Sequence, residues 1–232
     1  MIQVYNLHKK FGKNQVLSAL DLKIEGGGIF AVLGPNGSGK TTLIKSILGM
    51  VVPNKGSISV LNKPIKSGWK YRQKINYLPQ IANFPGNLKV KELIAMIKDL
   101  RQKPSEEDKL IALFGLEPFM DKKLSTLSGG TKQKVNLVLT FMFNSPLIIL
   151  DEPTNGLDPA THIKLKNLIK EEKANGKTFL ITSHIMQFVE DVADEIVFLL
   201  EGKIYFKGSI EALKTKTEQT NFEHAIAAIS SN

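Results

Sequence analysis

The sequence predicts an α/β fold that combines a largely parallel sheet with an antiparallel β-subdomain and an inserted helical subdomain. Two observations lead to this prediction. Short apolar runs that are typical of strands alternate with segments of helical periodicity at both ends of the chain, which is the pattern of parallel sheets. Between residues 85 and 145, by contrast, helical spacing dominates. We therefore interpret the middle block as a helical lobe inserted into an α/β domain.

The chain up to residue 84 is expected to contribute strands to both sheets. Apolar residues at period two indicate half-buried strands, and the uninterrupted run Ile29–Leu33 indicates a strand buried on both faces. Leucines and isoleucines at helical spacing predict a helix over 39–50, which Gly49 and Pro53 help to end. The strands are expected near 2–4, 20–24, 29–33, 58–60 and 75–78.

The rest of the chain is predicted to form three helices and then a second alternation of strands and helices. Pro159 stands near the first position of one helix, and Glu201-Gly202 is typical of a hairpin turn. The expected helices are 90–100, 110–114, 129–143, 159–174 and 185–193, and the expected strands are 147–150, 179–182, 196–200 and 204–206. We divide the chain into a core with its β-subdomain (1–84 and 146–214), the helical subdomain (85–145) and a C-terminal tail (215–232).

Composition excludes several classes of protein. The 232 residues contain no cysteine, which rules out disulfides, thiolate zinc sites and cysteine nucleophiles. No stretch reaches the roughly 18 apolar residues that a membrane helix needs, and the N-terminus lacks the apolar segment of a signal peptide. The net charge is +9, but the lysines are scattered along the chain. We interpret them as solvated surface, and we expect neither nucleic-acid binding nor entry into the bilayer.

A glycine-rich segment directly follows one predicted strand and opens a helix. Residues 34–41 read GPNGSGKT and match the pattern G-x-x-x-x-G-K-[ST]. The glycines let backbone N–H groups face phosphate oxygens, and the helix N-terminus adds partial positive charge. Lys40 is expected at the β- and γ-phosphates, and the Thr41 hydroxyl at Mg²⁺. The segment therefore predicts a nucleoside triphosphate site.

Two acidic residues end the apolar run Leu147–Leu150. A buried parallel strand would deliver Asp151 and Glu152 to the carboxyl edge of the sheet, where ligands bind in open α/β folds. Asp151 suits the shell of Mg²⁺, a cation that prefers oxygen ligands. Glu152 is then free to polarise an attacking water as a general base.

Two further segments indicate contacts with phosphate. Ser128 precedes the pair Gly129-Gly130 at the start of a predicted helix, where it is a natural N-cap, so the chain has a second anion-binding helix end. Only the first helix end carries a lysine, which suggests that the second serves a different nucleotide. His184 follows a core strand and is expected to hydrogen-bond a γ-phosphate.

With these segments in place, the chain resembles the nucleotide-binding subunit of ABC transporters from Met1 to about Lys214. The resemblance implies a P-loop NTPase core with the two subdomains described above. It also implies that two subunits pair head to tail, with each ATP between the phosphate loop of one and the signature helix of the other. The motifs that carry it are, in order, Phe11-Gly12, GPNGSGKTT, Gln80, LSGG, LIILDEP, NGLDP and His184.

The resemblance also implies roles for individual residues. Phe11 would stack on adenine, Gln80 would sense Mg²⁺ or water at the lobe junction, and Asp158 would cross the dimer interface. His184 would orient the γ-phosphate and water. Catalysis would depend on Glu152, His184 and Gln80. Mg²⁺ would be held by Thr41, Gln80 and Asp151. ATP would contact Phe11, Gly34, Pro35, Asn36, Gly37, Ser38, Gly39, Lys40, Thr41 and Thr42 and, from the partner subunit, Ser128, Gly129 and Gly130.

One position departs from the family pattern. Thr131 stands where the signature usually has glutamine after LSGG. Threonine can still begin a helix and donate a hydrogen bond, so we expect little loss. The departure concerns the fine tuning of the signature contacts.

The resemblance implies an ATPase that acts as a homodimer with integral-membrane permease subunits at the cytoplasmic face of the membrane. Membrane association is expected through those partners. The NGLDP segment and the short tail resemble ATPases that serve ABC-2-type permeases, often exporters, and residues 77–85 resemble the ATPase of the transporter for copper-site maturation in nitrous oxide reductase. A soluble relative acting on DNA or ribosomes is the alternative class. A GTPase would need N-K-x-D, and Asn62-Lys63-Pro64-Ile65 lacks the aspartate.

Overall fold

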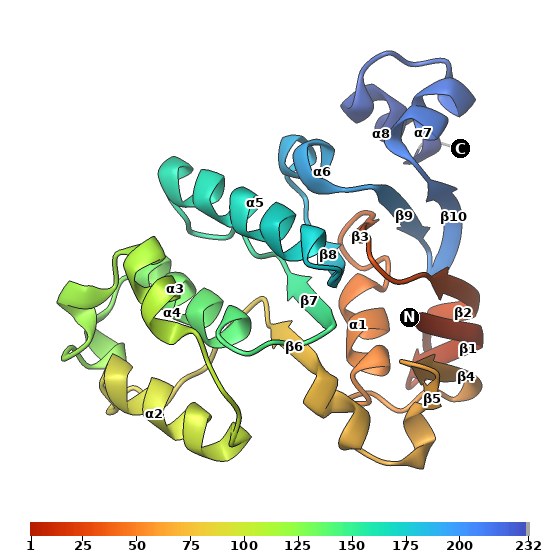
Figure 1. The fold of residues 1–232 in the computed structure, drawn as a ribbon. Coiled ribbons are helices and arrows are strands. Elements are labelled where there is room, and N and C mark those ends of the chain that lie inside the picture. Colours follow the sequence, from red (N-terminus) through yellow and green to blue (C-terminus); the bar gives the residue numbers. More distant parts are fainter. Residues whose placement is uncertain (231–232) are drawn as a thin grey trace.

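The computed structural model describes residues 1–230, which form two sheets and a separate helical lobe. Figure 1 shows the antiparallel sheet with the N-terminus at one side of the molecule and the lobe at the other. Between them lies a mixed sheet whose helices cover both of its faces. The predicted α/β class with a largely parallel sheet, an antiparallel β-subdomain and a helical insertion is confirmed.

The central sheet has six strands in the order β10-β9-β3-β8-β7-β6. All neighbouring pairs are parallel except β9 and β10, which form the predicted hairpin. Every residue of β3, β7 and β8 is buried, as expected for parallel strands covered on both faces. The strands are β3 (Ile29–Leu33), β6 (Ile75–Leu78), β7 (Leu147–Asp151), β8 (Thr178–Thr182), β9 (Glu195–Leu200) and β10 (Lys203–Gly208).

The second sheet is antiparallel and has the order β2-β1-β4-β5. Its strands are β1 (Ile2–Phe11), β2 (Asn14–Ile24), β4 (Lys55–Val60) and β5 (Lys63–Pro64). β1 and β2 are longer than period two predicts, because irregularities in their pairing interrupt the alternation of apolar residues. Asn6 and Ala19, one on each strand, have positive φ angles at these irregularities. The long strands carry the site residue Phe11 to the end of the hairpin.

Two cores cover the two faces of the central sheet. α1 (Lys40–Ile47) packs between the two sheets, whereas α5 (Pro159–Ala174) and α6 (Met186–Val192) cover the opposite face. β8 serves both cores through the alternation of its side chains. Phe179 packs with α5 and α6, and Leu180 packs with α1.

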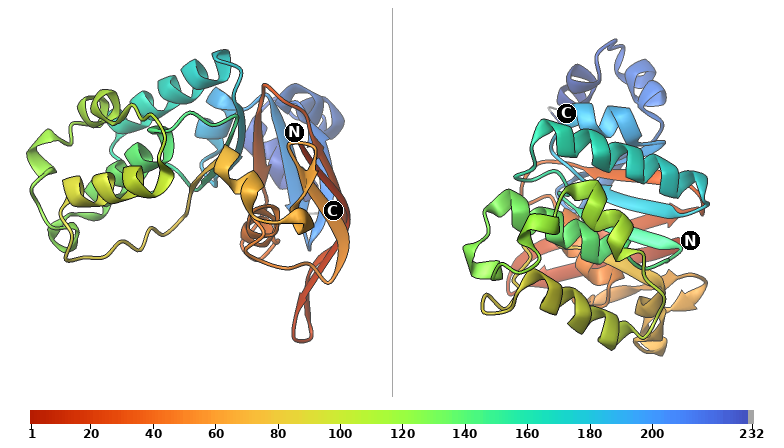
Figure 2. Two further views of the ribbon diagram at one scale, coloured as in Figure 1. Left: turned by 60° about the horizontal axis from the view of Figure 1, so that its bottom comes forward. Right: turned by 60° about the vertical axis from the view of Figure 1, so that its left-hand side comes forward.

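The helical lobe lies beside the end of the central sheet where β6 forms its edge (Figure 2). It contains α2 (Val90–Arg101), α3 (Glu107–Phe114) and α4 (Gly129–Phe141). α4 ends two residues before the predicted limit of 143. The bonds from the Asn76 amide to the Phe143 carbonyl and from Ser145 Oγ to the Asn76 side chain fix the chain where the lobe returns to the sheet. The described residues also contain four short 3₁₀ turns, at Ile65–Ser67 (η1), Lys70–Lys74 (η2), Glu117–Phe119 (η3) and Leu124–Thr126 (η4).

Two helices follow the hairpin at the C-terminus, α7 (Ile210–Thr217) and α8 (Phe222–Ser230). α7 runs across residue 214, where our division places the start of the tail. Phe222 and Ala225 of α8 are buried in a small third core with residues of β3 and β9. Ser231 and Asn232, the last two residues of the predicted tail, lie outside the described residues. Among the helices of residues 1–230, none has the length and apolar character needed to cross a membrane.

Candidate nucleotide-binding site

The glycine-rich loop lies between β3 and α1, as the motif requires. Gly34 has φ 143°, and a Cβ there would lie 2.0 Å from the carbonyl oxygen of Leu199. Gly39 caps α1 with φ 107°. Both glycines adopt backbone conformations that are unfavourable for residues with a side chain. At Gly34 the backbone of β9 also leaves no space for a Cβ. The glycines are therefore demanded by the shape of the loop.

Lys40 is folded over this loop. Its Nζ donates to the carbonyl oxygens of Gly34 at 2.7 Å and Pro35 at 3.0 Å. Burial lowers the pKa of Lys40, and the charges of Glu152 and Asp151 oppose that shift. The buried Ser38 hydroxyl has no hydrogen-bond partner among the described residues. A half-buried lysine and a buried, unpaired hydroxyl at a helix N-terminus fit a phosphate-bearing ligand.

These residues border a pocket of about 320 Å³ that four separate segments of the chain form. Phe11 stands at its rim, 50% exposed, with the Lys9 ammonium 4.7 Å from the centre of its ring. The pocket brings together ten of the residues expected from the sequence, and adds Asn14 and Val16. The lining is Phe11, Asn14, Val16, Asn36, Gly37, Gly39, Lys40, Thr41, Thr42, Gln80, Asp151 and Glu152.

Thr182, at the end of β8, contacts Asp151, the last residue of β7, and Glu152, which follows it. Its hydroxyl donates to Asp151 Oδ1 at 2.6 Å and accepts the backbone N–H of Glu152 at 3.0 Å. Glu152 is buried and has a positive φ of 53°, which is uncommon for this residue type. Burial raises the pKa of Asp151, whereas the bond from Thr182 lowers it. The parallel register, which pairs Asp151 with Thr182, creates this arrangement.

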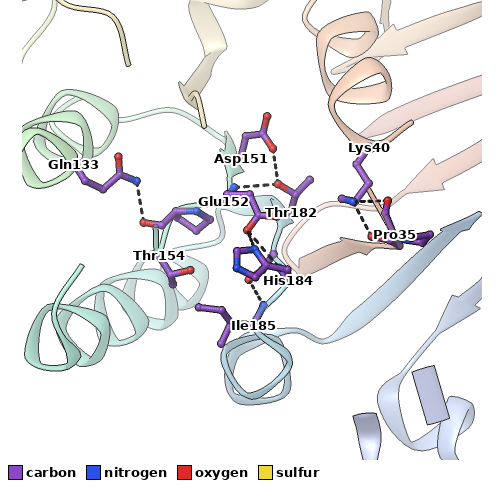
Figure 3. A network of polar contacts seen from close by, with 12 residues as sticks. Pro35, Lys40, Gln133, Asp151, Glu152, Thr154, Thr182, His184 and Ile185 are labelled. Carbon is purple, nitrogen blue, oxygen red and sulfur yellow. Dashed lines mark hydrogen bonds and ion pairs between the residues drawn. The ribbon is translucent and has the colours of Figure 1, made fainter. Parts of the chain in front are cut away.

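His184 contacts the second of these carboxylates. Its Nδ1 lies 2.8 Å from Glu152 Oε2, and its backbone N–H donates to the same oxygen at 3.3 Å. The imidazole is 68% exposed, while the glutamate side chain is 9% exposed. Figure 3 shows the histidine and the glutamate pointing toward one another, with Lys40 on the other side of the pocket. The structure thus brings two of the expected catalytic residues into direct contact.

The second predicted anion-binding helix end lies apart from this pocket. Ser128 is the N-cap of α4 and accepts the N–H of Thr131 at 3.3 Å, while the two hydroxyls are 2.9 Å apart. Thr131 thus supports the helix end in this chain. None of Ser128, Gly129 and Gly130 lines the pocket of Lys40 in the described structure. The two helix ends belong to different surfaces of one chain.

The segment before α5 packs against this second helix end. A Cβ at Gly130 would lie 2.6 Å from the Gly156 carbonyl oxygen, so the two backbones are in close contact. Asp158 caps α5 by accepting the N–H of Thr161 at 2.8 Å, and it pairs with Lys134 of α4 at 3.0 Å. Its carboxylate is therefore engaged within its own chain, and these bonds hold its pKa well below the usual range. Pro159 occupies the first turn, as predicted.

Besides Asn14, sequence reasoning missed three residues that shape the site. Thr182 ends an apolar strand, and its role depends on which strand lies beside it. Val16 is a pocket wall supplied by β2. Gly202, at the β9–β10 turn, donates its N–H to Ser38 O at 3.1 Å and accepts the Ser18 N–H at 3.0 Å. A Cβ at Gly202 would lie 2.3 Å from the Val16 carbonyl oxygen, so the turn joins the phosphate loop to the antiparallel sheet.

A glycine loop with a half-buried lysine, facing two carboxylates at the end of a parallel strand, is typical of a nucleoside triphosphatase. A model of the family described as ABC transporter matches residues 17–155, and curated relatives match most of the chain. The chain therefore belongs to the ABC transporter family, as an ATP-binding cassette with ATPase activity.

The relatives include proteins named for opposite directions of transport. The chain is 32% identical over 223 residues to the Nod factor export ATP-binding protein I of Burkholderia lata, covering 91% of this chain and 72% of the relative. It is 31% identical over 227 residues to the L-cystine import ATP-binding protein TcyC of Bacillus subtilis, covering 92% of each.

Solved structures agree with the fold. The ATP-binding subunit of an ABC transporter matches with a TM-score of 0.92 and 27% identity over 99% of both chains. A nucleotide-free ATP-binding cassette from an ABC transporter matches with a TM-score of 0.79 and 26% identity, covering 97% of this chain and 98% of that structure.

Proposed function

We propose that the chain hydrolyses ATP at a site completed by a second copy of itself. The observation that carries this proposal is the separation of two phosphate-binding helix ends. Lys40 borders the pocket, whereas the α4 end at Ser128 belongs to another surface of the same chain. Head-to-tail pairing of two chains would use both ends at one nucleotide, and a closed pair would contain two such sites.

Binding of ATP would involve residues from both sheets. Phe11 would stack on the adenine, and the N–H groups of 34–42 together with Lys40 would hold the phosphates. The oxygens of Thr41, Gln80 and Asp151 face one pocket and are the donors that would hold Mg²⁺. Within residues 1–230 no cluster of three or more acidic or histidine side chains forms a closed metal site. That donor set suits Mg²⁺, which neutralises charge on the phosphates when it is bound with ATP.

Hydrolysis would depend on the glutamate at the end of β7. Glu152 would accept a proton from the attacking water as general base, and its low exposure limits competing hydrogen bonds from solvent. His184 is within 2.8 Å of Glu152 and would orient water and the γ-phosphate. Gln80 lines the same pocket and follows β6. It would couple the binding of nucleotide in the pocket to the position of the helical lobe.

The work done by this cycle would be transport by integral-membrane permease subunits at the cytoplasmic face. We propose an ABC-2-type exporter. The names of several relatives, which are Nod factor export proteins, support export, and the resemblance of the NGLDP segment supports the same type. A relative named for L-cystine import has nearly the same sequence identity to this chain. Identification of the permease partner is therefore the test of the proposed direction and cargo. Copper-site maturation is the alternative cargo.

The proposal is tested by replacing Glu152 with glutamine. We expect turnover to fall by about 10²–10⁴-fold, because the general base is lost while ATP still binds. With ATP and Mg²⁺ the variant should elute as a dimer in size-exclusion chromatography with light scattering. The double variant Glu152→Gln, Lys40→Ala should remain monomeric, since it cannot hold the phosphates. A Glu152→Gln chain that stays monomeric at saturating ATP and Mg²⁺ would refute the shared site.

The permease partner requires a separate experiment. Expressed with its permease, the chain should sediment with membranes, and ATPase activity should respond to that permease after reconstitution. A chain that remains active but is recovered with ribosomes or DNA would instead favour the soluble class of ABC ATPases.

A further inference from the structure

The net positive charge of the chain is concentrated in one segment that contains no acidic residue. Of the 31 Lys and Arg and 22 Asp and Glu, residues 26–91 contain ten of the former and none of the latter. The remainder of the chain is therefore close to neutral, and the net charge of +9 arises from this one segment. The lysines are scattered along the sequence, but the carboxylates that would offset them are not.

Five of these cations are exposed along the segment between β4 and β6, which lies below α1 in Figure 1. None of the five forms an ion pair with a carboxylate within residues 1–230. By comparison, Lys89 and Lys91 at the end of the acid-free segment both pair with Asp121. The five residues are Lys63, Lys66, Lys70, Arg72 and Lys74, and we call them the basic edge.

Large apolar side chains are exposed beside the basic edge. Trp69, the single tryptophan of the chain, is 60% exposed between Lys66 and Lys70. Val52 is 75% exposed in the loop after α1, and Met50 in the same loop is 58% exposed. Val52, Ile65, Lys66 and Arg72 line one hollow of about 150 Å³, so the apolar and basic groups share a surface.

We propose that the basic edge and its apolar neighbours bind the headgroup region of an anionic phospholipid membrane. Unpaired Lys and Arg attract anionic headgroups, and a tryptophan is favoured at the boundary between headgroups and acyl chains. The exposed valine and methionine side chains would bury apolar surface by entering that boundary. The phosphates of a nucleic acid offer no apolar surface for them to contact. This direct lipid contact adds to the association through permease subunits in our proposed function, but it does not depend on ATP binding.

Trp69 makes the test direct, because it is the only tryptophan and reports on its own surroundings. The full chain is titrated with vesicles of phosphatidylcholine alone and of phosphatidylcholine with about one third phosphatidylserine. We expect a blue shift of the emission with the anionic vesicles, quenching by brominated acyl chains, and loss of binding at about 0.5 M salt. With neutral vesicles the spectrum should not move.

Charge variants separate this edge from the general charge of the chain. Replacing Lys63, Lys66 and Lys70 by glutamine should weaken binding about a hundredfold, since each cation near an anionic surface contributes roughly fivefold. A matched variant removes the same charge from three exposed lysines elsewhere, Lys170, Lys203 and Lys216. It should bind nearly as well as the parent chain. Trp69→Ser, followed by vesicle sedimentation, should weaken binding several-fold.

The inference is overturned if the two triple variants bind alike, or if the chain sediments with vesicles while Trp69 emission stays unchanged. It is also overturned if a single-stranded oligonucleotide quenches Trp69 at concentrations well below those of the lipid, which would make nucleic acid the partner. ATPase activity and the nucleotide-dependent dimer of the Glu152→Gln background are measured in the same variants. A parent chain that keeps both but binds no anionic vesicles would refute the lipid contact alone and leave the proposed function standing.

Discussion

His184 Nδ1 lies 2.8 Å from Glu152 Oε2, so the exposed imidazole closes over the buried glutamate. The same carboxylate oxygen accepts the backbone N–H of His184. The pair joins the end of β7 to the segment after β8. Its geometry makes the orientation of the proposed general base dependent on His184.

We predict that His184→Ala lowers kcat by about 10²–10³-fold, because the glutamate loses its orienting partner and the terminal phosphate loses a hydrogen bond. The side chain is largely exposed, so the thermal midpoint should change little. Steady-state ATPase assays and thermal unfolding measure the two effects. A variant that keeps full kcat would show that the contact has no role in hydrolysis.

Thr182 is predicted to position both acidic residues. Thr182→Val keeps the shape but removes the hydroxyl, and should lower the free energy of unfolding by about 1–3 kcal/mol and reduce kcat. Thr182→Ser keeps the hydroxyl and should recover most of both losses. Urea unfolding and binding of Mn²⁺ with ATP, followed by electron paramagnetic resonance, measure the effects. Equal behaviour of the valine and serine variants would contradict the prediction.

Asp151→Asn is predicted to raise stability in the absence of nucleotide and Mg²⁺. Burial raises the pKa of Asp151 above its ordinary value of 3.8, so the folded chain binds that proton more tightly than the unfolded chain. The free energy of unfolding therefore falls as pH rises through the interval between these two pKa values, and the loss is complete above it. The variant should be more stable than the parent at pH 7, and the difference should shrink in acid.

Asp158→Asn provides a control of opposite sign. Hydrogen bonds from Thr161 and the charge of Lys134 lower the pKa of Asp158, so its stabilising effect is present above the ordinary pKa and is lost in acid. This variant should be less stable than the parent at pH 7. Urea unfolding across pH measures both variants, and a shared sign would contradict the assignment.

Ser128→Ala is predicted to separate ATP binding from hydrolysis. The hydroxyl caps α4, and its loss should cost about 1 kcal/mol of stability. Because Ser128 does not line the pocket of Lys40, the affinity of a single chain for ATP should be unchanged, while dimer formation and turnover fall. Isothermal titration calorimetry under monomeric conditions, beside ATPase assays, tests this. A loss of affinity in the monomer would contradict the shared site.

Much of the fold was predictable because the central strands are uniformly apolar and most of the predicted helices are periodic. β3, β7 and β8 are buried along their whole length, and such runs are recognisable without structure. The lengths of β1 and β2 were not predictable, because irregular pairing near Asn6 and Ala19 breaks the apolar alternation. α8 was not predicted as a helix, because its short sequence is stabilised by packing against the central sheet.

The parts of the site that were predictable are those in which one short stretch of sequence contains all the residues needed for one chemical role. The loop before α1 and the carboxylates after β7 are of this kind, and the pocket unites them. Thr182 was missed because its partners come from a neighbouring strand, whose register with β8 is a tertiary property. The assignments of Ser128 and Asp158 to a second chain stay predictions, since they concern contacts between copies.

The turn at Gly202 touches the phosphate loop through Ser38 and the antiparallel sheet through Ser18. Phe11, the expected adenine contact, is carried by the first strand of that sheet. If ATP binds as proposed, the spacing between the adenine contact and the phosphate loop depends on a residue that does not line the pocket. A Cβ at this position would lie 2.3 Å from the Val16 carbonyl oxygen, so a side chain there would displace a wall of the pocket from a turn that does not line it.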